Sequence, residues 1–365
     1  MTEARRIEKG LPMTAMHEDA AGRAAESHER TAAAEQVARL KAARERIMQE
    51  MSQVIIGQTG AIEDILVCLL CRGHCLLEGM PGLAKTSIIR FLAQLLDLKF
   101  QRIQFTPDLM PADIIGTEVI EEDSATGRRQ FRFIKGPVFA NVILADEINR
   151  TPPKTQAALL ESMQELRVTA GGVTYPLEPP FLVLGTQNPI EQEGTYPLPE
   201  AQMDRFMFKV LIDYPSFEEE VRIAESTMTA DLANRKPALS KAEIVSLQDI
   251  VRHVLVARHV STYAVHMVRA SRPGDDLAPD FIRRWLTWGA SPRASQYLLM
   301  AGRARAILDG RLNVSCEDIR SVARPVLRHR IGTSFTAESE GVGVEEILGK
   351  LVESIPEPMP RRTEK

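Results

Sequence analysis

Hydrophobic positions in the first half of the chain follow the patterns of alternating helices and strands. Apolar residues recur near helical spacing from Glu35 onward and again over residues 61–71. Short, continuous apolar runs then alternate with helix-forming segments, as is typical of strands buried on both faces of a parallel sheet. The predicted strands cover residues 75–78, 100–105, 142–145, 181–186 and 207–212, and the helices between them cover residues 87–96 and 155–164. This order predicts an α/β fold with a doubly wound parallel sheet and helices on both faces.

Two further segments carry the alternation of antiparallel hairpins. Residues 117–134 alternate apolar and polar side chains around residues 125–128. Residues 167–176 alternate in the same way and turn at Gly171-Gly172. We therefore expect two hairpins inserted into the α/β domain.

After Tyr214-Pro215 the pattern becomes helical as far as about residue 330, which marks a domain boundary. Residues 1–34 hold few large apolar side chains and cannot bury much surface. The last residues are rich in proline and basic side chains. The predicted organisation is a disordered extension over residues 1–34, an α/β core over 35–214, a smaller all-helical lid over 215–350 and a flexible tail over 351–365.

Composition and charge narrow the classes of protein that fit. The 365 residues are 44% hydrophobic and 26% charged, and the net charge is −4. These values are ordinary for a globular protein and argue against stable nucleic-acid binding as the main task. No apolar stretch approaches the ~20 residues of a membrane span, and the first residues lack the apolar segment of a signal peptide. We expect a cytoplasmic protein with no membrane segment.

Three of the four cysteines lie close to a histidine, in a spacing that resembles a metal-binding knuckle. Cys68 and Cys71 fall inside an apolar helical run, and Cys75 opens the strand that follows His74. Cysteines in such runs act as small apolar core residues. We interpret them as buried side chains and not as metal ligands.

The most informative motif is Gly79-Met-Pro-Gly-Leu-Ala-Lys-Thr86, between a predicted strand and a predicted helix. Backbone N–H groups in such a loop can surround phosphate oxygens at the start of the helix. Lys85 can reach the outer phosphates, and the Thr86 hydroxyl can bind Mg²⁺. Ala84 stands where this motif usually has its second glycine. Because alanine disfavours positive φ, we predict right-handed helical geometry at Ala84.

A second motif follows about sixty residues later. The apolar run at residues 142–145 ends in Asp146 and Glu147. Ligands of doubly wound sheets bind at the carboxyl ends of the strands. Asp146 can therefore face a metal ion, while Glu147 can polarise a water molecule for attack on a γ-phosphate. The two motifs together predict a site that hydrolyses ATP.

These motifs, and the segments around them, resemble the MoxR family of AAA+ ATPases. The matching segments are residues 79–86, with the family's alanine form of the phosphate loop, and residues 105–116, 136–140, 145–154 and 185–206. The resemblance covers about residues 35–349. It implies an AAA+ P-loop NTPase core that binds ATP and Mg²⁺, followed by a helical lid, with the two hairpins facing a central pore or a partner.

By this resemblance, three segments build the nucleotide site. Lys85 and Thr86 match the phosphate-binding lysine and the Mg²⁺ ligand, and Asp146 and Glu147 match the metal ligand and the water-activating acid. Asn188 matches the sensor-1 residue, whose amide can hydrogen-bond the attacking water and the γ-phosphate. The other residues implied to bind the nucleotide are Ile55, Ile56, Gly57, Gly79, Met80, Pro81, Gly82, Leu83, Ala84 and Ser87.

The resemblance also marks arginines that could stabilise the phosphoryl group during transfer. Arg293 matches the sensor-2 arginine at the start of a lid helix, and it could serve its own subunit or a neighbour. Arg205 matches an arginine finger for the adjacent subunit, a group typically worth ~10³–10⁵ in rate. Arg150 is a rival for the same role.

The family resemblance implies a homo-oligomeric ring, expected to be a hexamer. It also implies chaperone-like remodelling, maturation or activation of a client or adaptor protein, which could carry a von Willebrand A domain. Three alternatives stay open. The chain could be the motor subunit of a metal chelatase, or a nucleic-acid-stimulated motor, because Arg128, Arg129 and Arg132 lie in the first hairpin. It could also be a scaffold that binds ATP with little turnover, although the presence of Glu147 argues against this.

Overall fold

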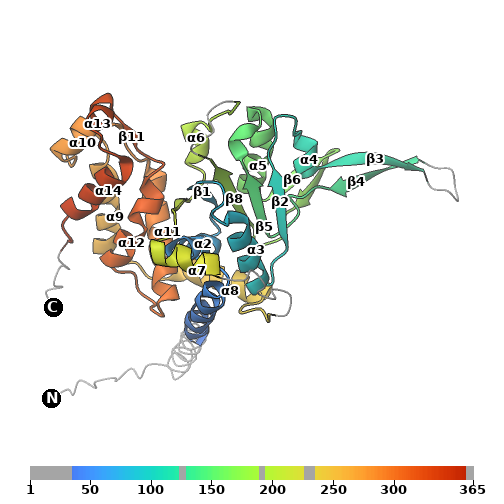
Figure 1. Ribbon diagram of the computed structural model, residues 1–365, viewed down its shortest axis with the longest axis horizontal. Helices are drawn as coiled ribbons and strands as arrows, with labels where there is room; N and C mark the ends of the chain where they lie inside the picture. Colours follow the sequence, from blue (N-terminus) through green and yellow to red (C-terminus); the bar gives the residue numbers. More distant parts are fainter. Residues whose placement is uncertain (1–34, 123–128, 189–193, 226–234, 359–365) are drawn as a thin grey trace, which may run out of the picture.

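The computed structural model describes residues 35–122, 129–188, 194–225 and 235–358. An α/β core and a helical lid lie side by side (Figure 1), and a helix over residues 35–52 precedes the core. The predictions for residues 1–34 and for the last seven residues lie outside the described residues.

The core is built on a five-stranded sheet in the order β2-β5-β8-β1-β9. β1 (Cys75–Gly79) lies between β8 (Leu182–Gln187) and β9 (Phe208–Ile212). β5 (Val142–Asp146) joins β8 to the edge strand β2 (Phe100–Gln104). All neighbouring strands run parallel, so their carboxyl ends meet at one edge of the sheet. The predicted doubly wound sheet is confirmed.

The two faces of the sheet belong to two separate hydrophobic cores. In β1, Leu77 packs into the core that contains α2 (Thr59–Leu70) and α3 (Lys85–Leu95). Its neighbour Leu76 packs into the core that contains α4 (Pro111–Ile115) and α5 (Pro153–Glu165). Because successive side chains of a strand point to opposite faces, a strand covered on both sides must be apolar throughout.

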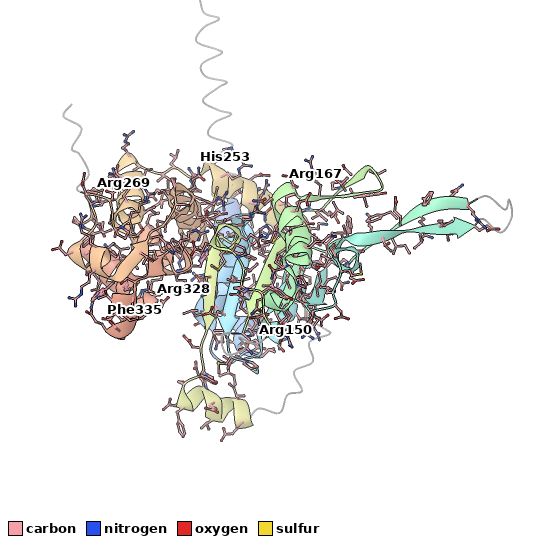
Figure 2. All side chains as sticks on the ribbon, turned by 90° about the horizontal axis from the view of Figure 1, so that it is seen from above. Arg150, Arg167, His253, Arg269, Arg328 and Phe335 are labelled. Carbon is pink, nitrogen blue, oxygen red and sulfur yellow. The ribbon has the colours of Figure 1, made fainter. Side chains whose placement is uncertain are left out.

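Both predicted hairpins are present. β3 (Gly116–Glu122) pairs with β4 (Arg129–Lys135), and β6 (Arg167–Ala170) pairs with β7 (Val173–Pro176). Both extend from the side of the core that faces away from the lid (Figure 2). The Phe133 ring of β4 stacks on the Tyr175 ring of β7, with centroids 4.5 Å apart. The two hairpins therefore contact each other and are linked mechanically.

The lid follows the connecting helix α7 (Phe217–Glu225). Its helices are α8 (Lys241–His253), α9 (Arg258–Ala270), α10 (Asp280–Trp285), α11 (Pro292–Leu308), α12 (Cys316–Leu327), α13 (Phe335–Ser339) and α14 (Val344–Ser354). The prediction of an all-helical lid needs one correction, because β10 (Leu286–Trp288) pairs antiparallel with β11 (Gly332–Thr333). Gly332 permits this pairing, since a Cβ there would lie only 2.0 Å from the Trp288 ring.

The C-terminal boundary of the lid also differs from the prediction. Helix α14 runs to Ser354, and Leu351 and Ile355 are buried in the main core. The flexible tail predicted from residue 351 is therefore wrong at its start, because these apolar side chains continue the buried face of the helix. Across the described part of the chain, each helix falls short of the length or the apolarity needed to cross a membrane.

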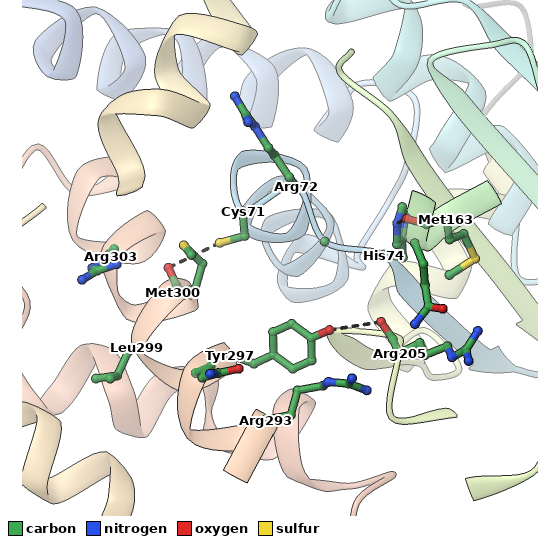
Figure 3. Close-up of a pocket in the computed structure, with 13 residues that line it drawn as sticks. Cys71, Arg72, His74, Met163, Arg205, Arg293, Tyr297, Leu299, Met300 and Arg303 are labelled. Carbon is green, nitrogen blue, oxygen red and sulfur yellow. Dashed lines mark hydrogen bonds between the residues drawn. The ribbon is translucent and has the colours of Figure 1, made fainter. Parts of the chain in front are cut away.

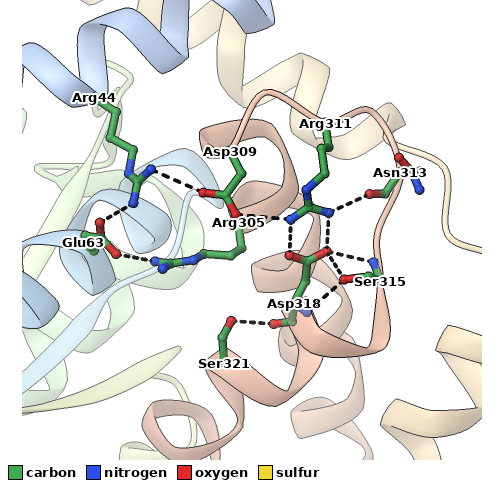
Figure 4. Close-up of polar contacts among 9 residues, drawn as sticks. All are labelled: Arg44, Glu63, Arg305, Asp309, Arg311, Asn313, Ser315, Asp318 and Ser321. Atoms are coloured by element: carbon green, nitrogen blue, oxygen red, sulfur yellow. Dashed lines mark hydrogen bonds and ion pairs between the residues drawn. The ribbon is translucent and has the colours of Figure 1, made fainter. Parts of the chain in front are cut away.

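A cluster of arginines and carboxylates ties the first helix and the lid to the core (Figure 4). Glu63 of α2 accepts hydrogen bonds from Arg44 of the first helix and from Arg305 of α11, the latter at 2.6 Å. Arg44 also donates to Asp309, just beyond α11. The first helix, α2 and α11 are thus held together through one carboxylate.

Candidate nucleotide site

The carboxyl ends of β1, β5 and β8 border a cavity of about 370 Å³. Residues from the phosphate loop, the acidic motif and the end of β8 line it together. They are Pro81, Gly82, Leu83, Ala84, Lys85, Thr86, Arg102, Asp146, Glu147, Thr186 and Asn188. The sheet topology therefore brings together the sequence-predicted loop, the carboxylate pair and Asn188.

The phosphate loop leads into α3 through a residue with unusual backbone geometry. Ala84, the N-cap of α3, has φ 54° and ψ 21°, which is the left-handed region. The right-handed geometry predicted for Ala84 is wrong. The loop turns at this position just before the helix begins, where glycine usually stands, and alanine has the smallest side chain that can replace it. A left-handed L-residue costs ~1–2 kcal/mol, so the loop holds local strain at the candidate site.

The Lys85 ammonium lies against the phosphate loop. Its Nζ donates to the backbone carbonyl of Gly79 at 2.5 Å and to that of Met80 at 3.3 Å. Burial lowers the pKa of Lys85, and the nearby Asp146 and Glu147 carboxylates oppose that shift. A cation is thus held at the mouth of a loop whose backbone N–H groups can donate hydrogen bonds to phosphate oxygens.

Asp146 is held by hydrogen bonds on both of its carboxylate oxygens. The Thr186 hydroxyl of β8 donates to Oδ1 at 2.6 Å. Arg102 of β2 donates to Oδ2 through Nη2 at 2.6 Å. The same Thr186 hydroxyl accepts a hydrogen bond from the backbone N–H of Glu147 at 2.8 Å, so Thr186 fixes both acidic residues relative to each other.

The Glu147 side chain has two partners of its own. Gln104 at the end of β2 donates to Oε2 at 2.8 Å, and Arg150 donates to the same oxygen at 2.9 Å. Glu147 itself is left-handed, with φ 56°, at the junction of β5 and the short helix that follows. The backbone turns sharply there, and this turn aims the carboxylate into the cavity. Arg150 lies beside Glu147 of its own chain.

Sequence reasoning missed Arg102, Gln104 and Thr186 as site residues. Arg102 and Gln104 lie near the carboxyl end of β2, and Thr186 lies near that of β8. Both strands are direct neighbours of the acidic strand β5. Polar side chains at the ends of predicted strands 100–105 and 181–186 were the available signal. The order of strands was needed to recognise it, because only the order shows which strand ends are adjacent.

The oxygen donors of the cavity fit Mg²⁺. Thr86 offers a hydroxyl and Asp146 a carboxylate. Mg²⁺ prefers such hard ligands, and proteins usually hold it through one or two side chains together with substrate phosphates and water. No cluster of three or more metal-ligating side chains occurs among the described residues. A site of the Mg²⁺–phosphate type therefore fits better than an all-protein metal cage.

A second cavity, of about 570 Å³, adjoins the first and shares the loop residues 81–84 with it. Its apolar lining includes Ile55, Ile56 and Tyr214, and Ser87 faces it from the first turn of α3. Gly57 follows Ile56 with φ 76° and supports the turn into α2. The size and apolar character suit a nucleoside, with the phosphates directed into the first cavity.

Arg205 and Arg293 do not line either cavity. Both line a third cavity, of about 540 Å³, between the core and the lid (Figure 3). Arg205 precedes β9, which runs parallel to β1 in the register Cys75↔Phe208. Arg205 therefore lies beyond the end of the sheet opposite the phosphate loop. Arg293, in the first turn of α11, donates to Asp204 at 3.2 Å and is held beside Arg205.

His74 and the neighbouring cysteines are engaged in the protein interior. Nδ1 of His74 accepts a hydrogen bond from the backbone of Val183 at 3.1 Å, and Nε2 donates to the carbonyl of Met163 at 3.2 Å. Burial lowers the pKa of His74 to about 4. Cys68 and Cys75 are fully buried. Both ring nitrogens of His74 are thus used in packing the core. The expectation that the cysteines are buried holds for Cys68 and Cys75, whereas Cys71 is only half-buried.

Comparison with family models identifies the two parts of the chain. The model described as "ATPase family associated with various cellular activities (AAA)" matches residues 74–208. A model described as an AAA lid domain matches residues 282–351. The first range spans the sheet from β1 to β9, and the second covers most of the lid.

Whole-chain relatives give a more specific answer. Chaperone MoxR1 of Mycobacterium tuberculosis is 44% identical over 85% of this chain and 81% of its own. Protein MoxR of Methylorubrum extorquens is 30% identical over 86% of this chain and 94% of its own. The crystal structure of a proposed ATPase from Cytophaga hutchinsonii superimposes with a TM-score of 0.82 at 40% identity, over 90% of this chain and 98% of that one. The chain belongs to the MoxR family of AAA+ ATPases.

Proposed function

We propose that this chain hydrolyses ATP in the cytoplasm, at sites that are completed by neighbouring subunits of a homo-oligomeric ring. One observation carries the proposal. Lys85, Asp146 and Glu147 line one cavity, whereas Arg205 and Arg293 lie together at the other end of the sheet. A five-residue strand is ~16 Å long, so a guanidinium at that end serves the phosphates of another subunit more readily than its own.

Each residue of the cavity has a role that follows from its position. Backbone N–H groups of the loop and the Lys85 ammonium would hold the phosphates of ATP. Thr86 and Asp146 would hold Mg²⁺, which supplies charge neutralisation at the transferring phosphate. Glu147 would orient and deprotonate the attacking water, and the Asn188 amide would align that water with the γ-phosphate.

The neighbour would supply the remaining positive charge. Arg205 at the ring interface would neutralise charge that develops in the transition state, and Arg293 would reach the same phosphate from the lid. We propose Arg205 over Arg150 as the arginine finger, and the ion pair between Arg150 and Glu147 of its own chain supports this choice. Sensor 2 would act between subunits for the same geometric reason. A hexamer is the ring size that we propose.

The output of hydrolysis is proposed to be the remodelling of a client or adaptor protein. On the β3–β4 hairpin, Ile120 and Phe131 stand directly opposite each other and are 62% and 76% exposed. Such an apolar pair on a projecting arm suits contact with a protein surface. A partner with a von Willebrand A domain is the client that we propose on family grounds.

The charges of the same hairpin disfavour the nucleic-acid alternative. Arg129 is paired with Glu122 at 3.3 Å, and Arg132 is paired with Glu121 at 3.1 Å. Arg128 lies outside the described residues. Electrostatic binding to a phosphate backbone needs unbalanced positive charge, and these two arginines are each balanced by a carboxylate on the paired strand.

Subunit mixing tests the shared site. An Arg205→Ala subunit keeps its nucleotide cavity but offers no finger, and a Glu147→Gln subunit offers a finger but cannot activate water. Each variant alone is expected to bind ATP without turnover, and mixed rings are expected to recover part of the wild-type rate. If mixed rings assemble and stay inactive, the site is contained in one subunit and the proposal is wrong.

A further inference from the structure

Side chains of the lid hold the backbone of the segment that carries Arg205. Arg330 donates to the carbonyls of residues 204, 206 and 207. Tyr297 donates to the carbonyl of Arg205 at 3.2 Å (Figure 3), and His329 donates through Nε2 to the carbonyl of residue 206 at 3.0 Å. Four consecutive carbonyls, from 204 to 207, therefore accept hydrogen bonds from the lid.

The Arg330 guanidinium is buried in the contact between the lid and residues 204–207. It is only 2% exposed, and its Nε donates to the Asp204 carboxylate at 2.7 Å. With the three carbonyls above and that of Val326, all five of its N–H donors have an acceptor. The Arg330 guanidinium carbon lies 4.9 Å from the centroid of the Tyr297 ring. Because the guanidinium is planar and its donors are fixed, it fixes the geometry of every group that it binds.

The Asp204 carboxylate connects Arg330 to Arg293, the second arginine proposed to reach the neighbouring subunit. While one of its oxygens accepts from Arg330, the other accepts from Arg293 at 3.2 Å and from the Ser291 hydroxyl at 3.3 Å. Charge-assisted hydrogen bonds of this kind are strong where water is largely excluded. The segment before β9 cannot shift against the lid without breaking several of them.

We propose that Arg330, together with Tyr297, positions Arg205 for the nucleotide of the neighbouring subunit. The inference rests on the proposed shared site and adds a residue to it. Arg330 reaches no phosphate itself, because its guanidinium is buried and its five N–H donors are used within its own chain. Its effect is to make the finger move as one unit with the lid, so that the orientation of a lid sets the rate of ATP hydrolysis in the next subunit.

Arg328 provides a matched control on the same segment of the lid. It also joins lid to core, since Nη1 donates to the carbonyl of Lys209 at 2.6 Å and Nε pairs with Glu345 at 2.8 Å. Figure 2 shows it where the two parts meet. Its core acceptor lies inside β9 and not in the segment that carries Arg205. Replacing Arg328 therefore loosens the junction between lid and core and leaves the hydrogen bonds to residues 204–207 in place.

The first test compares Arg330→Lys with Arg328→Lys in the full chain. Lysine keeps the charge but cannot bind these five acceptors in one plane. We expect Arg330→Lys to lower kcat by about 10²-fold, the loss typical of a ~1 Å misplacement, with KM for ATP close to that of the wild type. Arg328→Lys is expected to keep kcat within about twofold of the wild type, because its contacts do not determine where the finger points. Equal kcat losses in both variants, with equal falls in melting temperature, would mean that Arg330 only supports the fold.

Mixed rings separate this inference from the proposed function. Glu147→Gln subunits donate the finger, and Arg205→Ala subunits hold the active nucleotide. Arg330→Lys is expected to abolish the recovered turnover when placed in the donor and to leave it unchanged when placed in the acceptor. The same loss in either position contradicts the inference. Absence of turnover in the starting mixture contradicts the shared site itself.

A milder variant covers the case in which Arg330→Lys does not fold. Tyr297→Phe removes a single hydrogen bond, the one to the carbonyl of Arg205, and keeps the ring beneath Arg330. We expect a kcat loss of a few fold that again acts only from the donor subunit. Wild-type turnover in mixed rings whose donor subunits carry Tyr297→Phe would overturn the inference.

Discussion

Arg102 lies 2.6 Å from Asp146 through Nη2 and Oδ2, so the carboxylate proposed to hold Mg²⁺ is already part of an ion pair. Arg102 belongs to β2, the neighbour of the acidic strand. The Arg102 side chain is 47% exposed. Its guanidinium can therefore break the ion pair and move into solvent with a small loss of free energy. A cation that occupies the binding-competent carboxylate lowers the apparent affinity for any competing cation.

Replacing Arg102 by glutamine should therefore strengthen the response to Mg²⁺. We expect the concentration of free Mg²⁺ that gives half-maximal ATP turnover to fall about 1.4- to fivefold, because exposed ion pairs contribute roughly 0.2–1 kcal/mol. Turnover measured against free Mg²⁺ at saturating ATP tests this. Arg269→Gln, which breaks a surface pair with Asp275 in the lid, is the control. An unchanged Mg²⁺ response in Arg102→Gln would show that the ion pair does not compete.

Ala84→Gly should be tolerated by the fold and could raise its stability. Glycine adopts the left-handed geometry observed at this position without the penalty of a Cβ. The relief of ~1–2 kcal/mol is offset by up to ~1 kcal/mol of added freedom in the unfolded chain. We expect a change in unfolding free energy between zero and about +2 kcal/mol, measured by urea titration.

Ala157→Gly provides the comparison for that substitution. Ala157 is exposed in the interior of α5, where the same change costs ~1 kcal/mol. Opposite signs for the two substitutions would confirm that Ala84 is strained. A loss of ~1 kcal/mol at both positions would show that Ala84 is not left-handed in solution.

The sheet and the residues of the nucleotide cavity show what the sequence could predict and what it could not. The order of strands and helices was readable because buried parallel strands are apolar throughout and the helices between them are not. The phosphate loop, Asp146 and Glu147 could be found because their chemistry requires particular residue types at fixed spacing. The backbone geometry of Ala84 could not be predicted. Alanine by itself prefers negative φ, and the surrounding loop overrides that preference.

The position of Arg293 could not be predicted from the sequence, for a different reason. The family resemblance implied that Arg293 contacts a phosphate. Whether that phosphate belongs to the same subunit or to a neighbour depends on where the lid packs against the core. That packing is set by contacts such as Arg330 with Asp204, whose members are more than a hundred residues apart. Arg102 was missed likewise, because its role depends on the adjacency of β2 and β5 and not on any local pattern.

Asp64 predicts a specific dependence of stability on pH. Burial raises the pKa of Asp64 to about 7, from 3.8 in the unfolded chain. Between these values the folded protein holds a proton that the unfolded chain has lost, so this residue makes stability fall as pH rises through that window. Asp64→Asn should therefore raise the melting temperature at pH 8 more than at pH 5.

Thermal melting at the two pH values, with Asp276→Asn on the lid surface as the control for the loss of one charge, tests this prediction. The difference between Asp64→Asn and wild type should grow on going from pH 5 to pH 8, at ~1.4 kcal/mol for each pH unit below the folded-state pKa of about 7. An equal difference at both pH values would show that Asp64 ionises in the folded protein as it does in the unfolded chain.

The proposed sharing of the nucleotide site between subunits is tested most directly by a structure of the assembled protein with a non-hydrolysable ATP analogue and Mg²⁺. We expect the γ-phosphate to contact Lys85 and Asn188 of one subunit together with Arg205 and Arg293 of the next. A γ-phosphate surrounded by side chains of a single subunit, with Arg205 of the neighbour turned away from it, would contradict the account.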